Sequence, residues 1–242
     1  MSLLTVILPA AGKGTKLNLP YPKEILRLDK DEALIDFSFD FFRDRGRAEV
    51  EFVVVVNEEK TEILKYLGRY KDRFNVSFTF QNPREPEYTG AIKSARHLFG
   101  ESNLVLLPDT IMTLPPGVDL VDAVRECLAE TGFTFLFKRE TDPAMLRTKG
   151  ALAIGETGRV EEYEDKPTEE LGRFNAFWGG FAFLRGAFDA SMGYMEKSTL
   201  KRPVLPGEVR ATPLHGSRGI EVLEYKDLGT WEEIRKLLRD TV

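Results

Sequence analysis

A glycine-rich stretch with several lysines near the N-terminus has the residue types that bind phosphate groups. From Leu4 to Lys23 it reads LTVILPAAGKGTKLNLPYPK, an apolar run followed by small residues, with Lys13, Lys16 and Lys23 among and after them. Glycine permits positive φ and lets phosphate oxygens approach backbone N–H groups, and lysine adds mobile positive charge. The stretch predicts a buried strand that opens into a phosphate-binding turn, which could be a nucleotide site.

The glycine pattern alone does not identify a nucleotide. A G-x-G sequence is also compatible with a plain tight turn between a strand and a loop. It matches neither the Walker pattern G-x-x-x-x-G-K-[ST] nor the dinucleotide fingerprint G-x-G-x-x-G before a helix. Further residues are therefore needed to identify a nucleotide site.

Four charged residues are expected just after separate strands or strand-like segments. Lys23 follows the glycine loop, Asp109 follows a strand at 103–107, Lys166 follows the second strand of a hairpin, and Asp227 follows the last strand. Open parallel sheets bind ligands beyond the carboxyl ends of their strands. One aspartate after a strand is more often a turn former or a helix cap, and Lys166 could be a solvated lysine. Together, two carboxylates could hold Mg²⁺ at a triphosphate.

The order of predicted elements brings these residues to one sheet. In the first 140 or so residues, apolar strand-like runs alternate with helical patterns, which is typical of a doubly wound α/β fold. Strands are predicted at residues 4–8, 52–56, 76–80, 103–107 and 133–137. Helices are predicted at residues 31–45, at a segment capped by Asn57 with Ile63, Leu67 and Tyr70 inward, and at 89–99 and 119–130.

Beyond residue 140 the pattern changes to short strands. Strands at 150–154 and 160–163 flank a hairpin turn signal, and further elements are predicted as a strand at 177–184, a helix at 186–195 and a strand at 221–225. Thr230 and Glu233 form a capping-box pattern that opens a final helix. Residues 196–220 contain three prolines and several basic residues. A solvated loop, an oligomer contact and a lid all remain open for this segment.

Composition excludes several classes of partner. The 242 residues are 42% hydrophobic and 30% charged, with a net charge of −5 that argues against nucleic acid as a partner. Because no run approaches the roughly 20 apolar residues of a membrane span and no cleavable signal is recognisable, we expect a cytoplasmic protein without membrane contact. The single cysteine, Cys127, can form no internal disulfide, and its helical spacing predicts a core or helix-face position.

The N-terminal motif resembles that of the nucleotidyltransferases that join a nucleoside triphosphate to a sugar 1-phosphate. Residues 10–17 read AAGKGTKL and are followed by Pro22-Lys23, similar to the family pattern A-G-x-G-T-R-L and then P-K. Lys16 stands where arginine is usual, which keeps the charge but loses the planar two-pronged grip on phosphate. The segment from Leu17 to Pro22 is shorter than usual, which is similar to the cytidylyltransferases of isoprenoid synthesis.

Three later segments extend this resemblance over nearly the whole chain. Residues 106–109, LLPD, resemble the metal-aspartate segment in the form found in bacterial UTP-dependent glucose 1-phosphate uridylyltransferases, which also share the P-K-E at 22–24. Residues 164–167, EDKP, resemble the E-E-K-P element whose lysine meets the sugar phosphate, with Asp165 where glutamate is usual. Residues 226–230, KDLGT, resemble the D-x-G-T element that supplies a second metal aspartate.

The resemblance implies a Rossmann-like doubly wound mixed sheet with helices on both faces, in one domain over 1–242 with a nucleotide-binding half (1–140) and a sugar-binding half (141–242). It implies Mg²⁺ at Asp109 and Asp227. The implied catalytic residues are Lys16, Lys23, Asp109, Lys166 and Asp227. The implied nucleotide contacts are Ala10, Ala11, Gly12, Lys13, Gly14, Thr15, Gln81 and Gly90. The implied sugar contacts are Gly150, Asp165 and Gly180.

The implied reaction transfers a nucleotidyl group from a nucleoside triphosphate, with UTP or dTTP favoured, to a sugar 1-phosphate, releasing pyrophosphate. Its attacking oxygen is already anionic, so catalysis rests on positioning and charge neutralisation. Two alternatives stay open. The short segment after Leu17 is compatible with nucleotidyl transfer to a non-sugar phosphate. The unusual residues Lys16 and Asp165 are compatible with a catalytically silent nucleotide-sugar sensor. The expected partners are the two substrates, and a homo-oligomer remains open.

Overall fold

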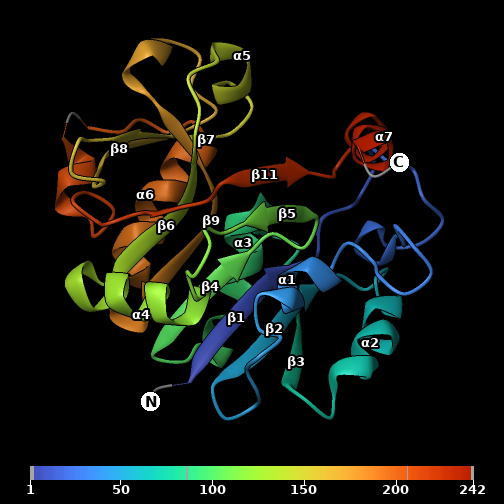
Figure 1. The fold of residues 1–242 in the computed structure, drawn as a ribbon. Coiled ribbons are helices and arrows are strands. Elements are labelled where there is room, and N and C mark those ends of the chain that lie inside the picture. Colours follow the sequence, from blue (N-terminus) through green and yellow to red (C-terminus); the bar gives the residue numbers. More distant parts are fainter. Residues whose placement is uncertain (1–2, 86, 206, 241–242) are drawn as a thin grey trace. The chain divides into compact units, whose positions relative to one another are not determined.

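The chain divides into two compact units whose segments interleave along the sequence. The computed structural model describes residues 3–85, 87–205 and 207–240. Unit 1 comprises Met1–Gly100, Val105–Thr113 and Glu224–Val242, and unit 2 comprises Glu101–Leu104 and Leu114–Leu223 (Figure 1). Strand β4 (Ser102–Leu106) contributes residues to both units. The last strand and the last helix of the chain therefore belong to the same unit as the N-terminal glycine loop.

Unit 1 is built on parallel strands. The order is β4, β1 (Leu4–Pro9), β2 (Val50–Val56) and β3 (Asn75–Phe80), with β1 parallel to β2 and β2 parallel to β3. β1 and β2 are buried along nearly their whole length, as expected for strands covered on both faces. The parallel direction brings the loops after β1, β2 and β3 to one edge of the sheet.

Aromatic packing holds α1 (Asp36–Asp40) against β2. The ring of Phe39 stacks on Phe52 and on Tyr70, each at 4.0 Å between centroids, and Phe42 meets Phe52 edge-on at 5.5 Å. Phe39, Phe42 and Phe52 are almost completely buried. Each such ring removes 150–250 Å² of surface from water, so this cluster is a main stabilising element of unit 1.

Unit 1 has three further helices, of which α2 and α3 are shorter than the sequence predicts, and its last two strands form a separate ribbon. The helices are α2 (Glu62–Leu67), α3 (Glu87–Ser94) and α7 (Trp231–Asp240), with 3-10 turns η1 (Lys23–Ile25), η2 (Gly68–Tyr70) and η3 (Arg96–Leu98). The ribbon pairs β5 (Thr110–Thr113) antiparallel with β11 (Glu224–Asp227).

Unit 2 carries a mixed sheet. Strand β6 (Phe133–Arg139) lies between β10 (Ile220–Glu221), which is parallel to it, and β9 (Ala176–Leu184), which is antiparallel to it. The hairpin of β7 (Gly150–Ile154) and β8 (Val160–Asp165) joins β9 through β7. The helical elements are α4 (Leu120–Thr131), α5 (Pro143–Leu146), α6 (Phe188–Thr199), η4 (Leu171–Arg173), η5 (Arg185–Ala187) and η6 (Glu208–Ala211).

Most predicted elements are present, and the predicted α/β fold with a mixed sheet is confirmed. Cys127 is buried on α4 as expected, and burial raises the pKa of its thiol. Thr230 Oγ1 accepts a hydrogen bond from the N–H of Glu233 at 3.4 Å at the start of α7, in agreement with the capping pattern. None of the helices in the described residues has the length and apolarity needed to cross a bilayer.

Three helices have other bounds in the structure than the sequence predicts. The helix predicted at 31–45 is confined to α1, because Leu34 and Ile35 donate their N–H groups to the carbonyls of Leu26 and Glu24 (3.1 and 2.9 Å) and so leave the helical pattern. The helix predicted at 89–99 ends as α3 at Ser94 and continues as a 3-10 turn. The helix predicted at 186–195 starts at Phe188 and runs on to Thr199.

Asn57 and the segment before the last helix also differ from the prediction. Asn57 does not cap α2, which begins after Thr61; its side chain accepts the N–H of Glu59 in a local turn. The single strand predicted at 221–225 is two short strands, β10 and β11. Residues 196–220, left unassigned above, contain the end of α6, the turn η6 and the start of β10.

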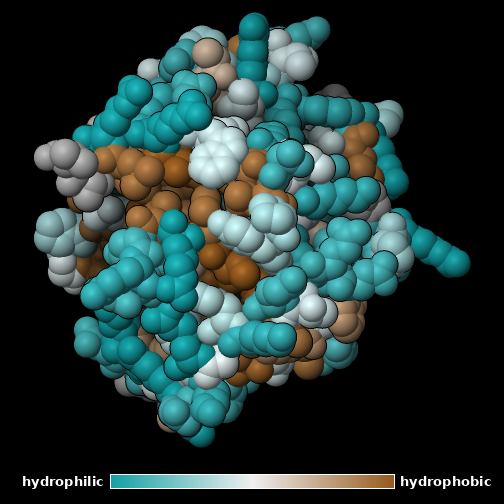
Figure 2. Space-filling view, turned by 90° about the vertical axis from the view of Figure 1, so that its right-hand side faces the viewer, coloured by the Kyte–Doolittle hydropathy of each residue, from teal (hydrophilic) through white to brown (hydrophobic). Residues whose placement is uncertain are grey.

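The surface is mostly hydrophilic, with some apolar residues exposed. Figure 2 shows one face on which hydrophobic residues reach the surface in several places among hydrophilic residues. Large apolar side chains with substantial exposure occur in both units. In unit 1 they are Tyr21, Phe80, Trp231 and Leu238, and in unit 2 Val118, Met145, Leu200, Val204, Leu205 and Leu223. Scattered exposed apolar residues are normal on soluble domains.

Candidate functional site

The glycine loop after β1 leaves its cationic side chains in solvent. The N–H of Ala10 continues the sheet by donating to the carbonyl of Val55 at 2.8 Å, and the side-chain amide of Asn57 donates to the carbonyl of Ala11 at 2.8 Å. Beyond these two anchors the loop turns outward, and Gly12, Lys13, Thr15 and Lys16 are exposed. The loop is therefore tied to β2 at its start while Lys13 and Lys16 are free to meet an anion.

Gly14 occupies a position that only glycine adopts easily. Its φ is +64°, in the left-handed region, and a methyl group placed on it would lie 3.8 Å from Cγ of Lys23. The turn brings the loop backbone against the stem of Lys23. Because the backbone is left-handed here, the second glycine of the motif has a conformational reason.

The loops that follow β1, β2 and β3 line a cavity of about 560 Å³. Its walls come from residues 11–13, residues 57–59, residues 81–83 and Glu87. Four of the predicted nucleotide contacts lie here together: Ala11, Gly12, Lys13 and Gln81. This is the carboxyl edge of the parallel strands, where doubly wound folds bind their ligands.

Gln81 and Gly90 are both engaged by the loop between β3 and α3. The side-chain nitrogen of Gln81 donates to the carbonyls of Glu85 (2.8 Å) and Glu87 (3.1 Å). A methyl group on Gly90 would lie only 1.8 Å from the carbonyl oxygen of Glu85. Gly90 is thus required for the loop to pack on α3, and it is not among the residues that line the cavity.

The ribbon of β5 and β11 brings the two predicted metal ligands together. Asp227 pairs with Thr110 in the ribbon, and the N–H of Leu228 donates to the carbonyl of Asp109 at 2.9 Å. A methyl group on Gly229 would lie 3.0 Å from Oδ1 of Asp227 and 3.7 Å from Oδ2 of Asp109. The two carboxylates therefore flank the same point. The sequence did not predict β5, whose only local signal is the four-residue run Thr110–Thr113.

This carboxylate pair fits a hard divalent cation. Carboxylate oxygens are preferred ligands of Mg²⁺, which takes most of its other ligands from water and substrate phosphates. The described residues contain no cluster of three or more histidine, cysteine, aspartate or glutamate side chains arranged to hold a metal ion. Asp109 and Asp227 thus match a site in which the substrate completes the coordination, rather than a cage built from protein alone.

Lys23 lies at the same carboxylates. It begins η1, and its ammonium forms an ion pair with Oδ2 of Asp109, with side-chain exposures of 20% and 17%. Burial by itself would lower the pKa of Lys23, but the carboxylate of Asp109, helped by Glu24 and Asp227, raises it above its ordinary value. Lys23 is therefore a fixed positive charge beside the acidic pair.

A buried ion pair beside this site was missed by the sequence analysis. Nζ of Lys60 donates to both carboxylate oxygens of Glu24, at 2.7 and 2.9 Å, and their side chains are 6% and 1% exposed. Burial lowers the pKa of Lys60 and raises the pKa of Glu24, and each partner opposes the shift of the other. The pair ties η1, which carries Lys23, to the segment before α2.

In unit 2 the β7–β8 hairpin brings Gly150, Asp165 and Lys166 together. Gly150 is the register partner of Asp165, which is buried, and Lys166 follows directly with an exposed side chain and a φ of +47°. Gly180 is buried in β9 opposite Leu136, next to a bulge in the pairing with β6.

Gly150 has a steric reason to be glycine. A methyl group on it would lie 1.8 Å from Nε1 and 2.5 Å from Cδ1 of Trp178, so the indole lies directly on its Cα. We expect Gly150→Ala to lower the free energy of unfolding by about 1–3 kcal/mol, because Trp178 must shift in a packed interior. Chemical denaturation measures this change.

Gly193, on α6, provides the matched control. Apart from its two chain neighbours and the backbone of its own helix, no atom lies within 4 Å of a methyl group placed there. Gly193→Ala should leave stability unchanged or raise it by up to about 1 kcal/mol, because alanine is the better helix former. Equal stabilities for Gly150→Ala and the parent would contradict the packing role of Gly150.

The other predicted candidates are placed as follows. Ala10 and Ala11 are buried, whereas Gly12, Thr15 and Lys16 are exposed on the loop. His97 is exposed on η3. In unit 1 the structure thus brings Ala11, Gly12, Lys13 and Gln81 to one cavity and Lys23 to the carboxylates of Asp109 and Asp227, whereas Gly90 lies outside the cavity. In unit 2 it brings Gly150, Asp165 and Lys166 to the end of one hairpin.

Comparison with known proteins identifies the family of the chain. Residues 4–241 match the family model described as nucleotidyl transferase. The Bifunctional protein GlmU of Hyphomonas neptunium (strain ATCC 15444) is 28% identical over 159 residues, which are 64% of this chain and 32% of that protein. The chain therefore aligns with about one third of the length of this curated relative.

Two solved structures share the fold over nearly the whole chain. One is a putative glucose-1-phosphate thymidylyltransferase from Bacillus anthracis in complex with a sucrose, with a TM-score of 0.74, 17% identity, and coverage of 99% of this chain and 96% of that one. The other is a UDP-glucose pyrophosphorylase complexed with UDP-glucose, with a TM-score of 0.76, 16% identity, and coverage of 100% and 98%. With the family match from residue 4 to residue 241, the chain belongs to the nucleotidyl transferase family.

Proposed function

We propose that this chain transfers a nucleotidyl group from a nucleoside triphosphate, with UTP or dTTP favoured, to a sugar 1-phosphate. The observation that carries the proposal is the meeting of Asp109, Asp227 and Lys23 in unit 1, because two carboxylates and a fixed cation are what a metal-bound triphosphate needs. The names of the two structural neighbours, a thymidylyltransferase and a UDP-glucose pyrophosphorylase, support the same class of reaction.

The reaction needs no protein base. The anionic phosphate oxygen of the sugar 1-phosphate attacks the α-phosphorus, a new P–O bond forms, and the bond between the α-phosphorus and the bridging oxygen breaks as pyrophosphate leaves. The protein must align the two phosphates and neutralise the charge on the leaving group. This fits a chain that has only two histidines, His97 and His215.

We assign the cationic side chains by their places on the two units. Lys13 and Lys16 of the glycine loop would bind the β- and γ-phosphates, and Lys23 the α-phosphate. On unit 2, Lys166 would bind the phosphate of the sugar, with Gly150, Asp165 and Gly180 around the sugar itself. Asp109 and Asp227 would hold Mg²⁺, which supplies charge neutralisation at the phosphates when bound.

The hydrogen bonds of Gln81 leave an acceptor that is compatible with a uracil or thymine base. Because its side-chain nitrogen already donates to two loop carbonyls, the amide oxygen is the group left for a ligand at the cavity. An amide oxygen accepts hydrogen bonds. The N3–H of uracil and thymine is a donor that this oxygen can accept, and so is the amino group of cytosine, so Gln81 is compatible with UTP or dTTP but does not select the base.

Pyrophosphate release in the presence of Mg²⁺ tests the proposal. The common nucleoside triphosphates should be combined with glucose 1-phosphate, other sugar 1-phosphates and several alcohol phosphates. We expect release with UTP or dTTP and a sugar 1-phosphate, loss of release when the metal is chelated, and recovery when Mg²⁺ is restored. Release only with CTP and an alcohol phosphate would favour the non-sugar acceptor. Silence in every combination, with a nucleotide sugar still bound, would indicate a sensor.

A further inference from the structure

The turn that carries Lys166 has an unfavourable backbone conformation and a complete set of hydrogen bonds. Lys166 has a φ of +47°, in the left-handed region that disfavours side chains with a Cβ. The N–H of Asp165 donates to Oγ of Ser198 at 2.8 Å, and the N–H of Lys166 donates to the carbonyl of Lys149 at 2.8 Å. Residues in such conformations persist only where their surroundings hold them.

Lys201 satisfies both carbonyls of the same turn. Its ammonium donates to the carbonyl of Asp165 and to the carbonyl of Lys166, the second at 2.9 Å. One side chain thus bridges two consecutive carbonyls across the left-handed residue. With Ser198 and Lys149 included, each backbone N–H and C=O of Asp165 and Lys166 has a named partner.

Lys201 occupies a position where helices usually place glycine. Helix α6 ends at Thr199, the N–H of Lys201 donates to the carbonyl of Ser198 (3.2 Å), and the N–H of Arg202 donates to the carbonyl of Lys197 (2.8 Å). These two bonds and a φ of +53° at Lys201 make a Schellman motif, whose left-handed residue is most often glycine. A lysine here is unfavourable for the backbone, so its side chain has another role.

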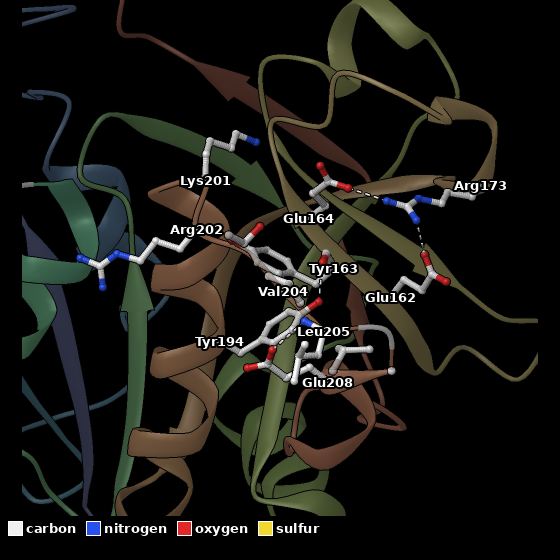
Figure 3. Close-up of a pocket in the computed structure, with 13 residues that line it drawn as sticks. Glu162, Tyr163, Glu164, Arg173, Tyr194, Lys201, Arg202, Val204, Leu205 and Glu208 are labelled. Carbon is white, nitrogen blue, oxygen red and sulfur yellow. Dashed lines mark hydrogen bonds and ion pairs between the residues drawn. The ribbon is translucent and has the colours of Figure 1, made fainter.

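The end of α6 is held at a fixed place on β8. The ring of Tyr194, on α6, meets the ring of Tyr163, on β8, edge-on at 6.2 Å, and its hydroxyl donates to the carbonyl of Tyr163 at 3.3 Å. Figure 3 shows these two tyrosines beside each other, with Lys201 at the end of the helix and Arg202 pointing away from them. Packing between α6 and β8 therefore sets where the ammonium of Lys201 lies.

We propose that Lys201, with Ser198, is a positioning residue that holds the Asp165–Lys166 turn so that Lys166 presents its ammonium to the phosphate of the sugar substrate. The inference rests on the proposed function of Lys166. The segment after α6 thereby has a role in the proposed sugar-phosphate site of unit 2. Lys201 touches only the backbone of the turn, so it acts through Lys166 and not on the substrate.

Variants at Lys201 separate this role from a role in helix capping. Lys201→Met keeps the length of the side chain but removes its donors, and Lys201→Gly also removes the unfavourable backbone conformation. If lysine only ended the helix, Lys201→Gly would be at least as stable as the parent protein and would have the same KM for glucose 1-phosphate. If its hydrogen bonds position Lys166, both variants should raise the KM for glucose 1-phosphate by about tenfold, the size expected for bonds from a charged but exposed donor. The KM for the nucleoside triphosphate should not change.

Three further variants test whether the change in KM is due to the donors of Lys201. Lys201→Arg keeps donors and charge and should restore most of the affinity for glucose 1-phosphate. Arg202→Ala removes a neighbouring exposed cation for which no ion pair is found among the described residues, and it should leave both KM values unchanged. Lys166→Ala, in the same assay, should raise the KM for glucose 1-phosphate at least as much as Lys201→Met.

The outcomes distinguish this inference from the proposed function. An active parent protein whose KM for glucose 1-phosphate is unchanged by Lys201→Met and Lys201→Gly would overturn the positioning role alone. An inactive parent protein would overturn the proposed function, and amide hydrogen exchange of a peptide that covers 160–170 would then decide. Faster exchange in Lys201→Met than in Arg202→Ala would support the hold on the turn, and equal exchange would overturn it.

Discussion

Asp109→Asn should reduce turnover by about 1,000-fold or more while leaving the fold intact. The asparagine has the same shape but loses the charge that pairs with Lys23 and that would hold Mg²⁺ beside Asp227. Removing one preorganised electrostatic contact at a reacting centre typically lowers the rate constant by a factor of about 100 to 1,000, and loss of a metal ligand should be at the upper end. Steady-state kinetics at saturating substrates and thermal unfolding measure the two quantities.

The control for this variant is Asp31→Asn. The carboxylate of Asp31 is 77% exposed, and its ion-pair partner Lys30 is 4.0 Å away, so the same chemical change should leave turnover unaltered. Asp227→Asn should resemble Asp109→Asn, and the double variant should be little worse than either single one, because the two carboxylates serve one ion. A turnover number for Asp109→Asn equal to that of the parent would remove Asp109 from the site.

The second large effect concerns stability and the buried pair of Glu24 and Lys60. Removing one partner leaves the other charge buried and uncompensated, which typically costs about 3–5 kcal/mol, whereas replacing both with apolar residues of similar size is often neutral or stabilising. We therefore expect Glu24→Met and Lys60→Met each to lower the free energy of unfolding by about 3–5 kcal/mol. The double variant should be more stable than either single one. Urea denaturation at a constant m value measures all three.

An exposed ion pair on α7 is the control for this experiment. Glu232 and Lys236 lie one helical turn apart on α7, with side-chain exposures of 78% and 57% and a distance of 3.1 Å. Glu232→Met should change the free energy of unfolding by less than about 1 kcal/mol, because solvent screens surface ion pairs. If the losses of Glu24→Met and Lys60→Met simply added in the double variant, the two charges would not be coupled in the fold.

Local patterns in the sequence were sufficient for the class of fold and for the glycine-rich loop after the first strand. Runs such as 52–56 are continuous and apolar because parallel strands are covered on both faces, so they can be recognised without knowing their neighbours. The glycine loop and the segments at 106–109, 164–167 and 226–230 are contiguous motifs, and they led to the family that the match over residues 4–241 confirms. The sites inferred from them remain predictions.

Only the tertiary structure decided how these motifs are supported. Asp109 and Asp227 flank one point because β5 pairs with β11, and a four-residue strand has too short a pattern to be recognised in the sequence. Gly150 must be glycine because Trp178 lies on it.

The bond of Lys60 to Glu24 and the bonds of Lys201 to the turn before Pro167 have the same origin. In each case the partners are distant in the chain, and their contact depends on the packing of whole elements. Sequence periodicity reports the face on which a residue lies, and not the residue that it meets there.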